Sequence, residues 1–541
     1  MRKSIHALAA LVLCAPLFAQ NINQTVQVTN DYVTRFADFQ KQGGALSVPD
    51  SLYRFDYNFD YSVFDTPYKG SYEFSPYRIR VTPQARLYDG SKFFMRAGAG
   101  YTFHPQFEMA WQLLEEKDFT IGVFADLGGY AGKYQGHAGG EAFKGRDLNG
   151  HVVINGQAIR PATRLSYQLG YDGIFDLQDG TNTSFRSAFN SGFVTGRIQS
   201  RERAENHLFY DFDLRLRHSA ETLPEWMGLY NSHETNLYVG VSTGPVLQEK
   251  YRILLDGVFE MEALGVYQTM FRNGSNVNFA RLRPHVDFLL GPVRVDAGVR
   301  LDWTEYDNST KKPFTFAPDV TVRMALLDAD MDLYAGVSGG QVMEGHFTLK
   351  QINHFVSRPN AGATISREKL RVLAGLEGHW KAGLQYAFEA GYVSYANKPL
   401  PFLGRISFVD YKTAYAMATM GWTSERLTVD GALSYAYHVL PEGVYAFAPA
   451  AFTADVRGTW NWDRKIFAGA FVEAASSRKS TSADVAAIPG YANVGLTGEY
   501  RFGRYFGVWA EGGNLLGMAI ERIPGLVEKG PYFTLGISLK L

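Results

Sequence analysis

The feature that most constrains this chain is a regular alternation of apolar and polar residues. Residues 210–217, YDFDLRLR, show it clearly: Tyr, Phe and two Leu residues occupy every second position, and Asp211, Asp213, Arg215 and Arg217 occupy the others. Successive side chains of a β-strand point to opposite faces of the sheet. The segment therefore predicts a strand with one apolar and one charged face.

The same pattern predicts a hairpin over residues 277–306. Its two arms meet at Gly291-Pro292, and Pro284 lies on the apolar face of the first arm, where it removes a ladder hydrogen bond and is a candidate β-bulge. The charged face of this hairpin contains Arg281, Arg283, His285, Asp287, Arg294, Asp296, Arg300 and Asp302.

Alternating segments of this kind predict about 22 strands, with boundaries good to about two to four residues. They cover residues 91–102, 106–114, 118–132, 149–159, 163–174, 184–200, 207–217, 233–244, 250–264, 277–290, 293–306, 314–327, 332–342, 367–380, 385–396, 412–423, 427–438, 448–461, 465–477, 490–502, 504–516 and 532–541. Most of these strands have about ten to fifteen residues, whereas strands of soluble sheets commonly have about five or six. Strands of that length cross a bilayer at a tilt. We find no long stretch with a helical period.

The connections between these segments alternate between short and long. Short ones include Gly291-Pro292 and Ser424-Glu425-Arg426, and long ones include residues 133–148, 218–232, 343–366, 397–411, 478–489 and 517–531. Outer-membrane barrels have short periplasmic turns and longer outside loops. One connection departs from this pattern, because His104-Pro105 is short where a long loop is expected.

These patterns predict an all-β fold, a transmembrane antiparallel β-barrel of about 22 strands, with 14–20 strands as the alternative. A set of soluble β-sandwiches also alternates with one wet face. The long strands, the charged polar face and the aromatic-rich apolar face favour the barrel. The chain also ends as a strand, in which Phe533, Leu535, Ile537, Leu539 and Leu541 share one face.

Composition agrees with one large barrel. The length of 541 residues would otherwise suggest about three or four soluble domains. Aromatic residues make up 14% of the chain, and the formal net charge of −1 makes a nucleic-acid partner unfavourable. The mean hydropathy of −0.17 is too low for a bundle of membrane helices.

The first nineteen residues predict a secretory signal peptide. A basic start that includes Arg2 and Lys3 precedes an apolar run, and cleavage is expected after Ala19. A buried helix and a lipoprotein acylated at Cys14 are the alternatives, and Leu13 stands where a lipoprotein requires a small residue. Cys14 is the single cysteine, which excludes a disulfide scaffold and a cysteine-based zinc site. We expect three regions: signal peptide 1–19, periplasmic or lumenal extension 20–90, and outer-membrane barrel 91–541.

The end of the chain carries a family resemblance. Asn514-Leu515-Leu516-Gly517, Pro524-Gly525 and residues 530–537, GPYFTLGI, resemble the last strands of TonB-dependent receptor barrels. The terminal residue of that family is usually Phe, where this chain has Leu541. Residues 25–32, TVQVTNDY, resemble the start of a plugless receptor-like group found in Bacteroidetes. The resemblance implies a 22-stranded barrel in the outer membrane of a Gram-negative cell.

The chain departs from that family before the first strand. Receptors of this family fill the barrel with an N-terminal plug of well over a hundred residues, whereas only about 70 residues separate the signal peptide from the first predicted strand. This shortage puts TonB-coupled import in doubt. Residues 20–90 are expected to lie in the lumen, pack beneath the barrel or bind another protein.

Several motifs look catalytic or metal-binding, but each lacks its required context. Residues 336–340, GVSGG, match a nucleophile elbow, yet here the motif is expected to end a barrel strand with no helix after it. Residues 328–332 resemble the opening of a calcium loop but lack its glycine and final acid. His233-Glu234 does not continue as H-E-x-x-H, and His218-Ser219 is the single adjacent pair that a barrel lipase could use. We therefore predict no enzyme activity, no catalytic or metal-binding residues and no cofactor.

The charged faces supply the candidate functional residues. We expect these side chains to face the lumen, where they either select solutes or pair across strands and stiffen the wall. They are Asp211, Asp213, Arg215, Arg217, Arg281, Arg283, Asp287, Arg294, Asp296, Arg300 and Asp302. The expected function is passage of an unidentified solute across the outer membrane. The alternatives are an accessory subunit that binds outer-membrane proteins or surface lipoproteins and, remotely, a barrel hydrolase.

Overall fold

The computed structural model describes residues 92–541 except 102, 136, 180–183, 202–205, 223–231, 249, 267–274, 307–312, 327–330, 354–363, 381–382, 403–404 and 529. The expected signal peptide 1–19 and extension 20–90 lie outside the described residues and stay predictions. Within the described part of the chain, no helix is long and apolar enough to span a membrane.

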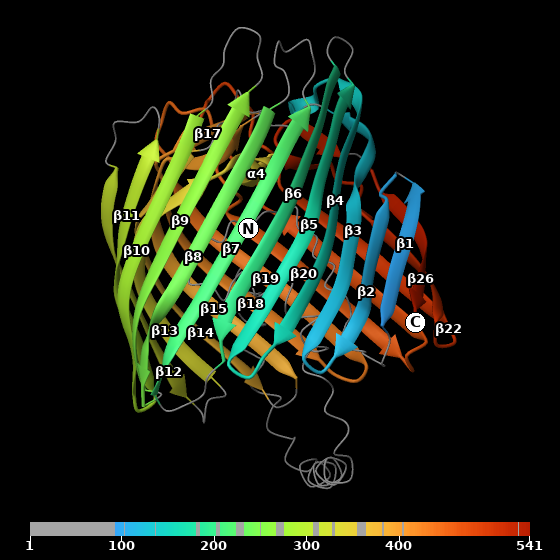
Figure 1. Cartoon of the computed structure of the whole chain (residues 1–541). Coiled ribbons are helices and arrows are strands. Elements are labelled where there is room, and N and C mark those ends of the chain that lie inside the picture. The colour runs from blue at the N-terminus through green and yellow to red at the C-terminus, as the bar shows by residue number, and fades with distance from the viewer. Residues whose placement is uncertain are drawn as a thin grey trace, which may run out of the picture. The chain divides into compact units, whose positions relative to one another are not determined.

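The described chain forms a closed antiparallel barrel of 22 strands (Figure 1). These strands are β1 (Phe93–Tyr101), β2 (Gln106–Glu116), β3 (Phe119–Gln135), β4 (Ala142–Ile159), β5 (Thr163–Asp179), β6 (Ser184–Ser200), β7 (Asn206–Thr222), β8 (Ser232–Leu247), β9 (Tyr251–Val266), β10 (Ser275–Leu290), β11 (Val293–Tyr306), β12 (Phe314–Leu326), β13 (Met331–Glu344), β14 (Thr364–Trp380), β15 (Leu384–Ala396), β18 (Lys412–Thr423), β19 (Leu427–Val439), β20 (Phe452–Trp462), β21 (Ile466–Ala475), β22 (Tyr491–Phe502), β23 (Phe506–Gly513) and β26 (Tyr532–Lys540). Each predicted strand corresponds to one of them, so the predicted fold class and strand number are confirmed.

Among the described residues, two hairpins and two short helices lie in the connections. They are β16 (Lys398–Phe402) with β17 (Arg405–Val409), β24 (Ile520–Ile523) with β25 (Leu526–Glu528), the 3-10 helix η3 (His137–Gly139) and the α-helix α4 (His346–Ile352). All four belong to the ends of the barrel where the long loops lie, which we call the long-loop end. The opposite end, with tight connections such as Gly291-Pro292, is the short-turn end.

The barrel closes where its first and last strands meet. β1 pairs with β26 from Phe94↔Lys540 to Tyr101↔Phe533, and β26 pairs with β23 on its other side. A spanning sheet must pair every backbone amide and carbonyl because the hydrocarbon offers no hydrogen-bond partner. Closure at β1–β26 meets that requirement.

The two faces of the wall have opposite chemistry. Leu214 on β7 and Leu282 on β10 are 50% and 52% exposed, whereas Arg281 and Arg283 beside Leu282 are 8% and 6% exposed. The apolar residues therefore lie on the exterior face, where lipid contacts a membrane barrel, and the charged residues lie on the inner face.

Seven inner-face glycines are covered by aromatic rings of neighbouring strands. A Cβ added at Gly170 would lie 2.2 Å from Cζ of Phe193, and one added at Gly536 would lie 2.4 Å from Cε2 of Trp509. The covering pairs are Tyr134–Gly145, Phe193–Gly170, Tyr334–Gly375, Tyr415–Gly391, Phe471–Gly495, Trp509–Gly536 and Tyr532–Gly513. Such pairing of rings with glycines supports strand register. Part of the aromatic content thus belongs to the inner face.

The strands at the long-loop end are longer than predicted. β3 and β4 leave only residues 136–141 between them, where a loop over 133–148 was expected, and β7 continues to Thr222 rather than ending at 217. Near this end charged residues such as Lys133 and Lys144 replace apolar ones on the exterior face, so the hydrophobic alternation stops before the strand does. The residues of β16–β17 and β24–β25 were predicted as loops for a similar reason, since each arm has five or fewer residues.

Two smaller predictions about local structure are wrong. Pro284 interrupts the β10–β11 ladder, but Leu282↔Leu301 and His285↔Gly298 keep the same register, so there is no bulge. The motif at 336–340 lies inside β13 rather than at its end, and α4 begins soon after the strand.

We predict that Gly170→Val will lower the free energy of unfolding by about 2 kcal/mol, because the new methyl groups would overlap the Phe193 ring. The cost should largely disappear in a Phe193→Ala background. Gly192→Val on the exterior face of β6 is the matched control, since nothing lies within 4 Å of its added Cβ. Equal effects of the two glycine substitutions in denaturant titrations of the purified barrel would contradict this packing.

Candidate lumenal site

Every one of the predicted inner-face charges takes part in an ion pair. The pairs are Arg197–Asp211, Arg215–Asp213, Arg217–Asp172, Arg281–Asp302, Arg294–Asp287 and Arg300–Asp319, together with Arg283 and its three aspartates Asp256, Asp296 and Asp319. Most partners lie on adjacent strands, which is the arrangement expected of charges that stiffen the wall. Whether these residues also select a solute stays a prediction.

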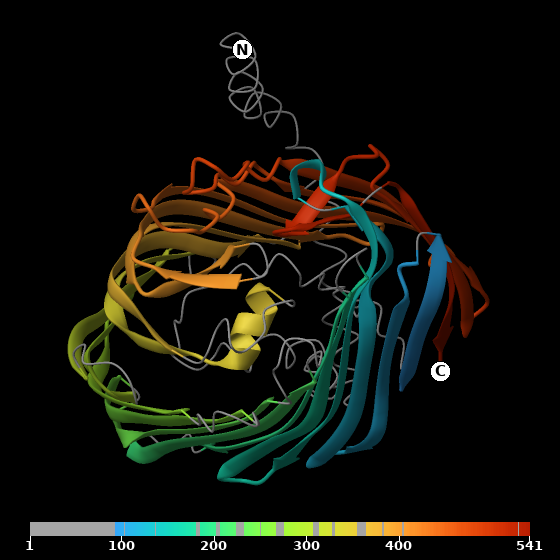
Figure 2. The same ribbon diagram turned by 90° about the horizontal axis from the view of Figure 1, so that it is seen from above.

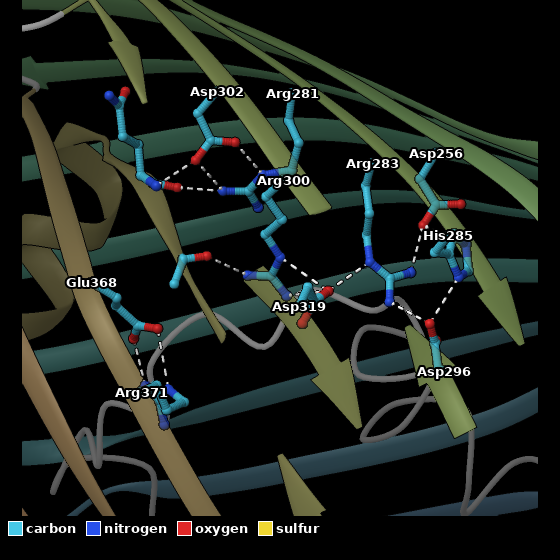
Figure 3. A network of polar contacts seen from close by, with 12 residues as sticks. Asp256, Arg281, Arg283, His285, Asp296, Arg300, Asp302, Asp319, Glu368 and Arg371 are labelled. Atoms are coloured by element: carbon cyan, nitrogen blue, oxygen red, sulfur yellow. Dashed lines mark hydrogen bonds and ion pairs between the residues drawn. The ribbon is translucent and has the colours of Figure 1, made fainter. Parts of the chain in front are cut away.

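The most buried of these pairs, Arg281–Asp302, lies against a bulge in β13 (Figure 3). Asp302 accepts a 2.7 Å hydrogen bond from Nε of Arg281 and a 2.6 Å bond from the backbone N–H of Gln341. Arg281 in turn donates to the Gln341 carbonyl at 2.7 Å. The β13–β14 register shifts between Ser338 and Gly340. A Cβ at Gly340 would lie 2.8 Å from Asp302, so the glycine at this bulge lets the side chains reach the backbone.

Arg283 is the centre of a second cluster on the same wall. Its guanidinium donates to Asp319 at 2.6 Å, to Asp296 at 2.9 Å and to Asp256 at 3.0 Å. His285 lies 3.0 Å from Asp296 through Nδ1. Asp319 also accepts a 3.0 Å hydrogen bond from Arg300, so each buried charge of the cluster has an opposite charge beside it, as buried ions require.

The adjacent residues His218 and Ser219 of β7 have separate hydrogen-bond partners. His218 is exposed and its Nδ1 lies 2.9 Å from Oγ1 of Thr235, whereas Ser219 is 1% exposed and donates to Ser191. The two side chains thus point to opposite faces of β7. Among the described residues, no group of three or more His, Cys, Asp and Glu side chains could hold a metal ion. The expected calcium-like segment 328–332 falls largely outside the described residues.

No pattern in the sequence predicted the helix that lies inside the barrel. Figure 2 shows α4 inside the ring of strands. Its Lys350 forms an ion pair with Glu221 of β7, and both side chains are at most 1% exposed. His346 adds a 3.0 Å contact from Nε2 to the same carboxylate, and its backbone N–H donates to Glu262 of β9 at 3.2 Å.

Aromatic contacts fix the same helix against the wall. The guanidinium of Arg217 lies 3.8 Å from the ring centroid of Phe347, and Phe189 of β6 lies 6.0 Å from that ring. Cation–π contacts of this kind stabilise by about 2 kcal/mol when they are desolvated. One predicted inner-face charge, Arg217, therefore contacts the lumenal helix.

A second side of α4 packs on the hairpin β16–β17. Leu349 and Ile406 form a buried apolar cluster, with Ile352 and Phe408 against it. The hairpin is tied to the barrel by Lys398, whose Nζ lies 3.0 Å from Glu344 at the end of β13. α4 is thus held between the wall of β6–β9 and a second inserted segment, so it narrows the lumen.

The last long connection, between β23 and β26, forms the hairpin β24–β25. β25 pairs with β3 through Val527↔Gln135, and Arg522 of β24 contacts Glu473 at 2.9 Å and Glu528 at 2.7 Å. Burial raises the pKa of the Glu528 carboxyl, and the Arg522 guanidinium opposes that rise. This hairpin therefore joins the barrel wall at β3.

The comparisons with known proteins place the fold. No family model matches the chain, and no curated protein matches its sequence. Among solved structures, the FrpB iron transporter from Neisseria meningitidis aligns with a TM-score of 0.62 and 8% identity, over 83% of this chain and 81% of that one. The ferric-catecholate import receptor Fiu from K12 E. coli aligns at 0.60 and 10%, over 83% and 82%.

The copper transporter OprC aligns at 0.58 and 12% identity, over 84% of this chain and 80% of that chain. The likeness to these three structures is in the fold, so the resemblance read from the end of the sequence is confirmed for the barrel alone. The narrower likeness to a plugless group rests on residues 25–32, outside the described residues, and stays a prediction.

We predict that Lys350→Met will lower the free energy of opening of α4 by about 3 kcal/mol, because Glu221 would keep a buried charge without its lysine. Hydrogen exchange at residues 346–353 measures this opening. Adding Glu221→Gln should recover part of the loss.

Lys369→Met is the matched control. Lys369 pairs with Asp410, but the two side chains are 46% and 61% exposed, so the change should cost less than about 1 kcal/mol. Unchanged protection of α4 in Lys350→Met would show that the ion pair does not hold the helix.

Proposed function

We propose that the chain resides in the outer membrane and passes a polar solute through its lumen, with α4 as the constriction of the path. The observation that carries the proposal is the opposite chemistry of the two faces in a closed barrel of 22 strands. An apolar exterior fits lipid, and a charged inner face fits a hydrated path. The solved structures that share the fold include transporters of iron and copper, which agrees with transport as the general role.

The position of α4 supports its place in this proposal. The helix lies inside the barrel and is anchored to β7 and β9 by Glu221 and Glu262. An inserted segment held by buried ion pairs gives a path of fixed width, whereas a mobile loop would give a path of variable width. The inner-face arginines and aspartates are paired with one another, so we expect weak selectivity between anions and cations of similar size.

The proposal leaves two sequence predictions as they stand. The absence of a full plug and the doubt about TonB-coupled import both concern residues 20–90, outside the described residues. The role of an accessory subunit with outer-membrane or surface-lipoprotein partners is also a prediction of the sequence.

Conductance of the purified full-length protein in planar bilayers tests the proposal. We expect discrete channel openings, and we expect Lys350→Met to enlarge or destabilise the open current because it releases α4 from the wall. Lys369→Met should leave the current unchanged. Absence of conductance in both the native protein and Lys350→Met would contradict solute passage. Identical currents in all three would contradict the role of α4 alone.

A further inference from the structure

Four bases interrupt the exterior face of the barrel near its long-loop end. Strand alternation places Lys133 on the face of exposed Leu127, places Lys144 and Arg146 on the face of Val152 and Ile154, and places Arg186 on the face of Val194. We call Lys133, Lys144, Arg146 and Arg186 the exterior basic patch. The other exterior positions of β3, β4 and β6 are uncharged.

Strand register brings the four bases together. Lys133 and Lys144 are direct cross-strand partners in the β3–β4 pair. Arg146 and Arg186 lie on either side of Leu177, which is the register partner of both. Like charges directly opposite each other destabilise a sheet. The arrangement therefore costs stability unless an anion lies among them.

The bases of this patch differ from those of the inner face. Each predicted inner-face arginine has a carboxylate partner, whereas none of the four patch bases makes an ion pair with a described residue. Lys133, Lys144 and Arg186 are exposed, and Nε of Arg146 is buried without a hydrogen-bond partner. Asp179 is the register partner of Lys144, which leaves the patch with a net positive charge.

The patch lies at the edge of the apolar exterior. Phe103 in the β1–β2 connection forms a backbone bridge with Ala131, two residues from Lys133. Phe103 and its neighbour Tyr101 are 47% and 78% exposed, so apolar side chains reach the level of the bases. Long loops of outer-membrane barrels face outward. The patch is therefore at the level of the outer-leaflet headgroups.

We propose that the exterior basic patch binds the phosphate groups of a phosphorylated glycolipid of the outer leaflet. Arginine and lysine are the side chains that most often bind phosphate. Here Arg146 and Arg186 lie on either side of Leu177, close enough to contact one phosphorylated headgroup together. The acyl chains of such a lipid would lie along the apolar positions below, including Leu127, Val152 and Ile154. The proposal is independent of solute passage, since it uses only the exterior face.

Native mass spectrometry of the purified full-length protein in detergent tests the proposal. The probes are lipid A with two phosphates and the same lipid after enzymatic removal of both. We expect the phosphorylated lipid to bind preferentially. Each Lys→Gln or Arg→Gln change in the patch should weaken its binding about fivefold, as expected for one base near an anionic surface. The fourfold variant K133Q/K144Q/R146Q/R186Q should lose detectable binding.

The control variant K117Q/R426Q/R464Q/K465Q removes four exposed bases at the short-turn end and should bind as the native protein does. Both variants must show the heat-dependent gel mobility of a folded barrel. Equal binding of the two lipids would overturn the proposal, since it would show that phosphate is not recognised. Equal binding by the patch variant and the control would overturn it as well. Capture of an acidic protein in place of lipid would favour a protein partner and also count against it.

Discussion

The structure depends on one constraint: a sheet that spans hydrocarbon must satisfy every backbone hydrogen bond within itself. Pairing of β1 with β26 removes the last free edges of the sheet. Once the sheet is closed, each strand has one face toward lipid and one toward the lumen. The alternation in the sequence, the apolar exterior and the charged inner face all follow from that closure.

The inner face carries charge without leaving it unbalanced. Arg281, Arg283 and Arg300 contact aspartates on neighbouring strands, and the bulge at Gly340 adds backbone partners. Charge pairing also anchors α4, because the buried Lys350 and Glu221 neutralise each other. The wall and the inserted helix share these contacts, and this is why we propose a path of fixed width.

The barrel was predictable from the sequence, but the contents of its lumen were not. Period-two alternation identified every barrel strand and placed Arg281 and Asp302 on one face, since that signal is local. α4 has seven residues, too few to show a helical period. Its partner Glu221 lies 125 residues before His346, so only the closed barrel brings them together. The pairing of rings with glycines, such as Phe193 with Gly170, likewise depends on strand register.

The most direct test of the account compares two adjacent positions on β6, Thr195 on the inner face and Val194 on the exterior face, where it is 48% exposed. Single cysteines are placed at each position by Thr195→Cys and Val194→Cys, and intact cells are treated with a small, water-soluble, membrane-impermeant maleimide. If Thr195 faces a hydrated lumen and Val194 faces lipid, the Thr195→Cys protein is labelled and the Val194→Cys protein is protected. Labelling at Val194→Cys with protection at Thr195→Cys would contradict the assignment of the two faces, and protection at both would contradict a hydrated lumen.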